Sequence, residues 1–248
     1  MILFTILYGI LVIIFTILCL IVLFSFSPII IIFALIFGKK VIIRYVHSIA
    51  SFWGTCLMKM TLSSVKVECR ENYDINQTYI LTPNHQSAFD IFCCFSLFKK
   101  SYAFVSKDGY GKIPFIGMAM YLSNYILIRR GTVGAGKSID DMKDRLKSKT
   151  SLIIYPEGSR SSDGEIRKPK RGILKISETC QDIPILPVVI YGTKDIMKAK
   201  TIKIIPFRKI KVRFLKPFYF KDIQGDDIDK LNYWYELMKK NYDELKNS

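Results

Sequence analysis

Histidine and acidic side chains are scarce in this 248-residue chain. It has two histidines, His47 and His85, and 21 Asp and Glu stand against 37 Lys and Arg, which leaves a formal net charge of +16. The six cysteines have neither zinc-ligand nor disulfide-framework spacing, so we expect no metal site and a reducing compartment. No G-x-S-x-G segment is present, so the chain lacks the serine nucleophile that this motif marks. A basic chain with 50% hydrophobic residues indicates association with a membrane and with anionic lipid, a phosphorylated substrate or nucleic acid.

Charge is also missing from residues 1–38. Residues 1–24 alone would span about 36 Å as a helix, enough to cross a bilayer core of about 30 Å. Basic residues at 39, 40 and 44 follow and predict a cytoplasmic end by the positive-inside rule. The run has no basic start and no small-residue cleavage site, which disfavours a cleaved signal peptide. Pro28 interrupts it, and the sequence allows either a single crossing or a shallow hairpin. The alternative is a pair of helices in the core of a soluble protein. It is disfavoured because so long an apolar run would have to be enclosed by protein on all sides.

Residues 62–248 have the pattern of an α/β domain, in which short β-rich runs alternate with helical stripes. We predict a mixed central sheet with flanking helices, preceded by a membrane-anchoring helical segment at residues 1–61. Within that segment, residues 41–61 resemble an interfacial helix, and His47 is expected to be structural. The expected strands lie at residues 65–69, 79–81, 102–105, 125–128, 152–155, 185–191 and 210–214. One expected helix has an apolar stripe at Ile139, Met142 and Leu146. A second, near the end of the chain, has a stripe from Ile228 to Leu245 and is expected to be capped by Asp226 or Asp227.

The segment at residues 84–90 places one of the two histidines just after an expected buried strand, which Pro83 would end. An imidazole there can take a proton from an alcohol if a carboxylate fixes its tautomer, and Asp90 is the candidate. Five residues correspond to about 140° around a helix, so the pair can meet only if His85 precedes the first turn and Asp90 lies within it. The alternative is a capping box of Ser87 with Asp90, which would leave His85 without chemistry.

Basic residues follow other expected strands. In the loop after residues 152–155, Arg160 offers a planar guanidinium that suits a phosphate, and the amides and hydroxyls of Gly158 and Ser159 lie beside it in the sequence. Lys107 and Arg130 end two further expected strands, and open α/β sheets bind their ligands at that edge. The alternative is that all of these side chains belong to solvated loops.

Residues 131–138 satisfy the P-loop pattern, with a strand expected before them and a helix after. A nucleotide-binding protein is therefore an alternative. Against it, no apolar strand further along the chain ends in the aspartate that would hold magnesium. Glycines before a helix capped by Ser138 with Asp141 explain the segment without a ligand.

Taken in order, four blocks resemble the 1-acylglycerol-3-phosphate acyltransferase family of glycerolipid synthesis. They are Asn-His-x-Ser-x-x-Asp at 84–90, Lys…Pro-Phe-x-Gly…Arg from 107 to 130, Pro-Glu-Gly-Ser-Arg-Ser at 156–161 and Leu-Pro-Val at 186–188. The resemblance covers about residues 65–191 and implies an acyltransferase domain at residues 62–248. It implies His85 as general base, Asp90 as its orienting partner and Pro187 near the acyl site. The implied acceptor-binding residues are Lys107, Arg130, Glu157, Gly158, Ser159 and Arg160.

The resemblance also implies a reaction. An acyl chain would pass from a thioester of coenzyme A or acyl carrier protein to the sn-2 hydroxyl of lysophosphatidic acid, giving phosphatidic acid, with no metal or prosthetic group. The implied location is the cytoplasmic face of the cell (inner) membrane, with anionic lipid as a partner. Nucleic acid is not expected, since the aromatic residues are not interleaved with the basic ones. Glycerol 3-phosphate or a lysophospholipid stays open as acceptor. Arg129 stands where the family commonly has aspartate, so either Arg129 or Arg130 is the candidate for the ligand.

Overall fold

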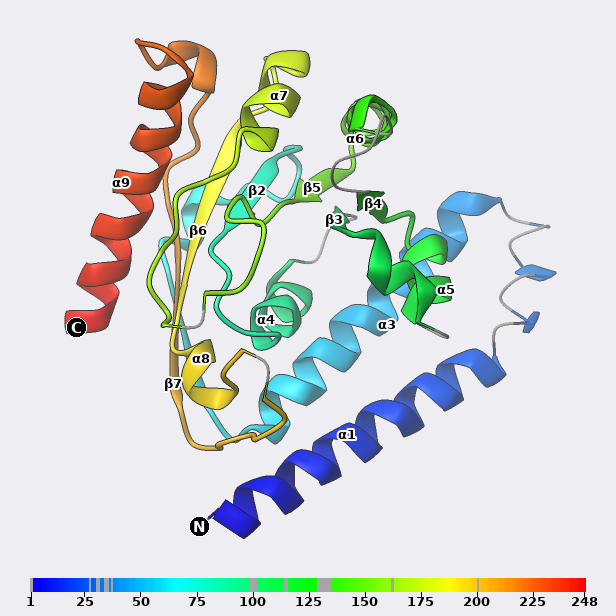
Figure 1. Cartoon of the computed structure of the whole chain (residues 1–248). Helices are drawn as coiled ribbons and strands as arrows, with labels where there is room; N and C mark the ends of the chain where they lie inside the picture. Colours follow the sequence, from blue (N-terminus) through cyan, green and yellow to red (C-terminus); the bar gives the residue numbers. More distant parts are fainter. Residues whose placement is uncertain are drawn as a thin grey trace.

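A mixed sheet between two layers of helices organises the chain (Figure 1). The computed structural model describes residues 2–26, 28–29, 32–33, 36, 38–98, 102–113, 116–128, 135–161, 163–199 and 201–248. Within these residues, seven strands form one sheet in the order β1-β7-β6-β2-β5-β3-β4. They are β1 (Ser64–Glu68), β2 (Ile80–Pro83), β3 (Tyr102–Lys107), β4 (Ile126–Ile128), β5 (Ser151–Ile153), β6 (Ile185–Tyr191) and β7 (Lys209–Phe214). Each overlaps one of the expected runs, so the predicted mixed α/β sheet is confirmed.

The helices alternate with these strands along the chain. They are α1 (Ile2–Ser25), α3 (Lys39–Met60), α4 (Phe89–Leu97), α5 (Ile116–Leu122), α6 (Ala135–Lys147), α7 (Gly172–Thr179), α8 (Thr193–Ile196) and α9 (Asp227–Asn247), with short 3-10 helices η1 (Arg70–Asn72), η2 (Asp108–Lys112) and η3 (Phe220–Asp222). The predicted cap of the last helix is Asp226, whose side chain accepts from the N–H groups of Ile228 and Asp229. Asp229 completes a capping box.

Strand direction decides which loops can meet. The strands β6, β2, β5, β3 and β4 run parallel to one another, whereas β7 is antiparallel to β6 and carries β1 alongside it. Parallel strands end at the same edge of a sheet, where open α/β sheets bind ligands. The segments after β2, β3 and β5 therefore leave from one edge, which we call the carboxyl edge.

The two faces of the sheet carry separate apolar clusters because successive side chains of a strand point to opposite sides. Leu81 and Ile153 face α3 and α4, whereas Ile80 and Leu152 face α6, α7 and α9. On the second face, the indole N–H of Trp234 in α9 donates to Thr82 Oγ1 at 2.9 Å. This bond ties α9 to β2, the strand that leads to His85.

The segment predicted as a membrane anchor contributes to the fold as well. α3 packs along α4 so closely that a Cβ on Gly54 would lie 2.5 Å from the Cβ of Phe95, and Leu57 and Met58 are buried in the same cluster as α4. The interval Val41–Met60 is nevertheless apolar and long enough to cross a membrane. Residues 39–60 thus pack in the core and also belong to the apolar segment, and the domain boundary expected after residue 61 stays a prediction.

Two further features of this segment follow the sequence expectations. His47 is buried and packs edge-on against Tyr102, with ring centroids 4.6 Å apart, as expected of a structural histidine. α1 is the predicted apolar N-terminal helix and has no charged residue. It contacts α3 and lies with α3 on the side of the molecule away from α9 (Figure 1).

Candidate active site

His85 and Asp90 meet at the carboxyl edge. β2 ends at Pro83 and α4 begins at Phe89, so His85 lies in the turn and Asp90 in the first helical turn, as their contact requires. His85 Nδ1 lies 2.9 Å from Asp90 Oδ2. A carboxylate that accepts from Nδ1–H fixes the tautomer and leaves Nε2 as the basic nitrogen. The His85 side chain keeps 15% of its surface exposed and Asp90 none, so the base faces outward while its partner is enclosed.

The Asp90 carboxylate accepts from three further donors. Its Oδ2 also accepts from the N–H groups of Gln86 at 2.6 Å and Ser87 at 2.8 Å, and its Oδ1 accepts from the Thr193 hydroxyl. The Ser87 hydroxyl in turn accepts from the N–H of Phe89 at 3.2 Å. These bonds resemble the capping box that was the alternative to a catalytic pair. One carboxylate therefore caps the turn and orients the histidine.

The loop after β5 holds the main chain of His85. Glu157 Oε1 accepts from the N–H of His85 at 2.8 Å, and the N–H of Ser161 donates to the carbonyl of His85 at 2.9 Å. The loop turns sharply between these contacts, because Gly158 has φ of +73° and its N–H donates to the carbonyl of Tyr155 at 3.0 Å. The blocks at residues 84–90 and 156–161 are thus one hydrogen-bonded unit.

Glu157 is buried at the centre of this unit. Its second oxygen accepts from the N–H of Arg167 at 3.3 Å. Burial raises the pKa of its carboxyl group to about 8, although two N–H donors act in the opposite direction. The structure therefore gives Glu157 contacts to the main chain around His85, which the sequence did not predict. Its expected contact with an acceptor stays a prediction.

Tyr155 lies against the imidazole and was missed by the sequence reasoning. The rings of Tyr155 and His85 are stacked with centroids 4.0 Å apart and an interplanar angle of 19°, and the phenol oxygen lies 3.7 Å from Cys94 Sγ. Burial raises the pKa of Tyr155 well above that of an ordinary phenol, so the ring stays neutral. Tyr155 was expected at the end of a strand, but β5 ends two residues earlier at Ile153. The phenol ring of Tyr155 therefore packs against one face of the imidazole.

Asn84 and Thr193 were also missed. The amide of Asn84 bonds the main chain of Ile190 twice, donating to its carbonyl at 2.9 Å and accepting from its N–H at 2.7 Å. Thr193 follows Gly192, whose φ is +92° and whose added Cβ would lie 2.2 Å from a carbonyl of β7. Both side chains join the His85 turn to β6 or α8 across more than a hundred residues. Within the sequence, no local pattern marks such partners.

The basic residues that were predicted to bind the acceptor lie around the same edge. Lys107 ends β3 and is exposed, and Arg160 is partly exposed in the loop after β5, the strand paired with β3. Ser159 is exposed and Gly158 partly so beside Arg160. Arg130, with its neighbour at 129, lies outside the described residues. Among the described residues, His85, Lys107 and Arg160 thus all follow or end strands at the carboxyl edge, and their binding of an acceptor stays a prediction.

The P-loop-like segment differs from its prediction where it is described. α6 begins at Ala135, so Ser138 lies inside the helix, where it is buried, and the expected cap of Ser138 with Asp141 is wrong. The helix thus begins four residues before Ile139, which would be its first residue if Ser138 were the cap. Residues 131–134 lie outside the described part of the chain.

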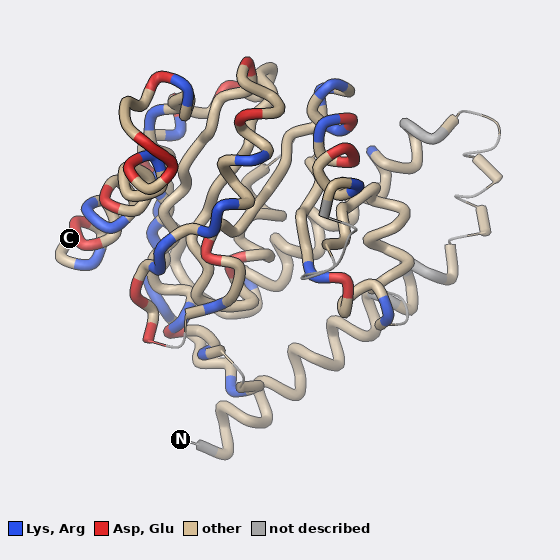
Figure 2. The backbone as a smooth tube through the Cα atoms, turned by 45° about the horizontal axis from the view of Figure 1, so that its top comes forward, with Lys and Arg blue, Asp and Glu red and all other residues tan. Residues whose placement is uncertain are grey.

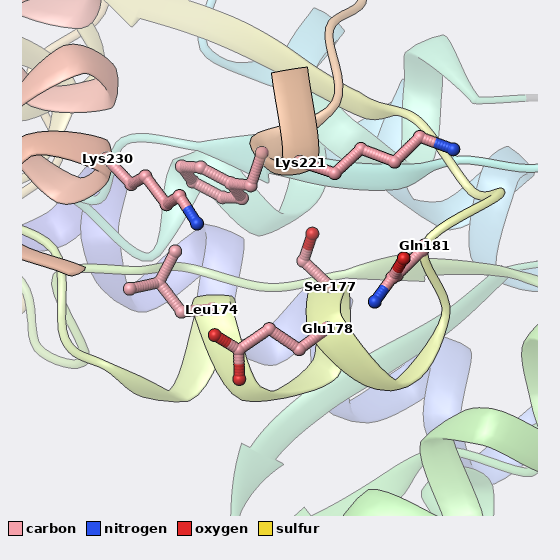
Figure 3. A pocket seen from close by; sticks show the side chains of 7 residues that line it. Leu174, Ser177, Glu178, Gln181, Lys221 and Lys230 are labelled. Carbon is pink, nitrogen blue, oxygen red and sulfur yellow. The ribbon is translucent and has the colours of Figure 1, made fainter. Parts of the chain in front are cut away.

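The described residues offer neither a metal site nor a pocket of the size that small-molecule ligands occupy. No group of three or more His, Cys, Asp or Glu side chains there is arranged to hold a metal ion. A pocket of about 80 Å³ lies between α7, η3 and α9 (Figure 3), far below the roughly 300–1,000 Å³ of ligand pockets. Its lining residues are Leu174, Ser177, Glu178, Gln181, Phe220, Lys221 and Lys230. None of them belongs to the His85 unit.

Removal of the Thr193 hydroxyl, which donates to the buried Asp90, is expected to lower the stability of the fold. The variant Thr193→Val leaves Asp90 Oδ1 without its hydroxyl donor in a fully buried position, and should lower the free energy of unfolding by about 1–3 kcal/mol. Thr193→Ser keeps the donor and should cost less. Denaturant unfolding of the three proteins in detergent measures the difference, and equal stability of the Val and Ser variants would contradict the bond.

The buried acid at position 157 predicts a pH dependence of stability. Its raised pKa means that the folded chain holds a proton that the unfolded chain releases between about pH 4.5 and about pH 8. The free energy of unfolding should therefore fall as pH rises through this window, by at most about 1.4 kcal/mol per pH unit from this group. Glu157→Gln should remove that part of the slope, and Glu236→Gln on the exposed face of α9 should not. Parallel curves for native and Glu157→Gln proteins would show that the carboxyl is already ionised.

Comparison with known proteins identifies the family of this domain. The family model described as Acyltransferase matches residues 64–191, just over half of the chain. The chloroplastic 1-acyl-sn-glycerol-3-phosphate acyltransferase BAT2 of Brassica napus is 28% identical over 213 residues, which cover 82% of this chain and 60% of that protein. The enzyme of that name from Saccharomyces cerevisiae is 32% identical over 180 residues, covering 69% of this chain and 57% of that one. The chain thus spans about three fifths of the length of these curated relatives.

A solved structure agrees with the fold. The 1-acyl-sn-glycerophosphate acyltransferase PlsC from Thermotoga maritima superposes with a TM-score of 0.77 at 23% identity, covering 100% of this chain and 97% of that one. The match by the family model includes β1 to β6, and with them the His85 turn and the loop that holds it. On these grounds the chain belongs to the acyltransferase family.

Proposed function

We propose that the chain acylates the sn-2 hydroxyl of 1-acylglycerol 3-phosphate with an acyl thioester of coenzyme A or acyl carrier protein, giving phosphatidic acid. The observation that carries this proposal is the 2.9 Å contact of His85 Nδ1 with the buried Asp90, which leaves Nε2 as the basic nitrogen of a partly exposed side chain. The names of the relatives add support, because they act on this acceptor. The donor is proposed from the family resemblance, and the chemistry agrees with it: a thiolate leaves a carbonyl readily, so a base is the main requirement.

In the proposed reaction, Nε2 of His85 takes the proton of the acceptor hydroxyl as its oxygen attacks the thioester carbonyl. The carbon–oxygen bond forms, the carbon–sulfur bond breaks, and the imidazolium returns its proton to the departing thiolate. Asp90 stabilises the imidazolium from the buried side, and the ring of Tyr155 packs against its face. No covalent enzyme intermediate is required, and no metal or prosthetic group is proposed.

The acceptor phosphate is proposed to bind the cations at the carboxyl edge. Arg160 can meet two phosphate oxygens with its planar guanidinium, and Lys107 adds a point charge from the neighbouring strand. Ser159 and Gly158 would shape the same site, and Arg130 is retained as a further candidate. Since burial keeps Glu157 neutral near pH 7, it does not repel the phosphate.

The reaction is proposed to take place at a bilayer surface, on the cytoplasmic face of the cell (inner) membrane. Both the acceptor, lysophosphatidic acid, and the product, phosphatidic acid, are membrane lipids. Two features support this placement: an uncharged α1 that exposes many large apolar side chains, and a net charge of +16 that favours anionic lipid.

Loss of the imidazole should abolish most of the activity. His85→Ala removes the base, and kcat for acylation of lysophosphatidic acid should fall by about 10²–10⁴-fold. Release of free thiol from acyl-CoA measures the rate. The other histidine supplies the control, since His47→Gln should keep kcat per folded molecule near the native value. Near-native turnover by a folded His85→Ala protein would refute the proposed mechanism.

Removal of the guanidinium should act on acceptor binding. A charge-assisted hydrogen bond contributes about 1.5–3 kcal/mol, so Arg160→Ala should raise the acceptor KM by roughly 10–100-fold, with the KM for acyl-CoA unchanged. Arg167→Ala is the matched control on the same loop, because its exposed side chain pairs with Asp163 at 3.6 Å. An unchanged acceptor KM in Arg160→Ala would exclude this residue from the phosphate site.

A further inference from the structure

The segment that joins β3 to β4 exposes a group of apolar and aromatic side chains. It comprises η2 and α5, and its exposed members are Tyr110, Ile113, Ile116, Met118 and Tyr121. Tyr121 is 80% exposed. Single exposed hydrophobic residues are ordinary on a protein surface, but a contiguous group marks an interaction site.

Within α5, helical geometry places two of these side chains on one outward face. Met118 and Tyr121 are three residues apart in α5 and so lie on the same side of the helix, whereas Met120 points inward and is buried. α5 has no charged residue. A surface helix of a soluble protein normally turns a polar face to water, and α5 turns an apolar one.

The unit is held rigidly to the rest of the domain. The N–H of Gly117 donates to the carbonyl of Ile113 at 2.8 Å, and a Cβ on Gly117 would lie 2.0 Å from the carbonyl oxygen of Gly111. A Cβ on Gly111 would in turn lie 2.5 Å from a methyl carbon of Leu127 in β4. The glycines therefore let α5 approach the backbone of η2 and let η2 pack on a side chain of β4, which sets the orientation of the apolar face.

We propose that this face, on η2 and α5, is a second contact with the lipid bilayer, beside α1. It rests on the proposed function, since it supplies the surface from which the acceptor would reach His85. Tyrosines favour the boundary between headgroups and acyl chains, and the exposed Lys107 and Lys112 flank the face with charge complementary to anionic lipid.

The bilayer is favoured over a protein partner by continuity with the apolar N-terminal helix. α5 contacts α3 and α3 contacts α1, and all three lie on the side of the molecule away from α9 (Figure 1). Figure 2 shows no charged residue along α1, whereas charges are dense on α9 and on the loops around it. The charged residues of α3 are all basic, and α1 and α5 carry no charge, so a lipid surface that covers α1 can extend to α5 without meeting an acidic side chain of these helices.

The position of the face relative to the site gives it a function. η2 begins directly after Lys107 at the end of β3, on the carboxyl edge that also carries His85. Seating η2 and α5 at the headgroup level turns this edge toward the membrane. A lysophospholipid could then present its phosphate and sn-2 hydroxyl while its acyl chain stays in the bilayer.

Fluorescence quenching in vesicles tests the contact without any turnover. The full chain carrying Tyr121→Trp is reconstituted in vesicles of phosphatidylcholine and phosphatidylglycerol, with and without brominated acyl chains. Native protein supplies the background of Trp53 and Trp234. The emission added by Tyr121→Trp should fall about twofold or more with brominated lipid, because tryptophan there would reach the acyl region. Tyr233→Trp, at an exposed tyrosine of α9, is the matched control and should not respond.

Each other outcome overturns the proposal. Unquenched emission at position 121 places the face in water. Emission that shifts to the blue with protein concentration and ignores bromine means that a second copy of the chain covers it. Equal quenching at positions 121 and 233 means that contact is not confined to this face. Quenching does not depend on catalysis, so a chain that fails to acylate lysophosphatidic acid but is quenched at 121 refutes the proposed function and leaves the contact standing.

A kinetic comparison completes the test. The double variant Met118→Glu with Tyr121→Glu should raise the KM for long-chain lysophosphatidic acid in vesicles by about tenfold, a loss near 1.4 kcal/mol. A short-chain, water-soluble lysophosphatidic acid should be acylated at the native rate. An equal loss with both acceptors would mean that the substitutions damage the fold or the site, and would count against a membrane role.

Discussion

The enclosed carboxylate of Asp90 is the interaction on which the candidate site depends. It accepts from the imidazole, from two successive main-chain amides and from the Thr193 hydroxyl. Those donors come from the turn after β2 and from the start of α8, so one group joins two strand ends of the sheet. The orientation of the base is therefore a property of the folded core, because the side chain that fixes it has no exposed surface.

Around this carboxylate, burial sets the charge of the site. Glu157 lies within the same unit, yet burial raises its pKa to about 8, so near neutral pH it serves the main chain of His85 as an uncharged acid. The site then carries one anion beneath the imidazole, and Arg160 and Lys107 retain their positive potential for a phosphate. Glu157 thus positions the main chain of His85, whereas Asp90 supplies the negative charge beside the imidazole.

Sequence reasoning reached the parts of this arrangement that depend on local pattern. The seven strands follow from β-rich runs, and the meeting of His85 with Asp90 follows from a turn that precedes a helix. The partners Thr193, Ile190 and Tyr155 could not be inferred, because they depend on which strands are neighbours and on a strand that ends at Ile153. The start of α6 was misjudged since glycine does not stop a helix from beginning early. The packing of α3 against α4 was not predicted, because an apolar helix has the same sequence pattern whether lipid or protein covers it.

The two-sided hold on the His85 backbone links specificity to rate. The stretch that would recognise the headgroup, residues 157–161, is also the one that bonds the N–H and the carbonyl of the base. Under the proposed function, substitutions in this stretch for a new headgroup would also alter the bonds that hold the main chain of His85. Lys107 ends a separate strand, β3, and makes neither of these bonds. Under the proposed function, a substitution that changes its charge could therefore alter substrate preference without disturbing the main chain of His85.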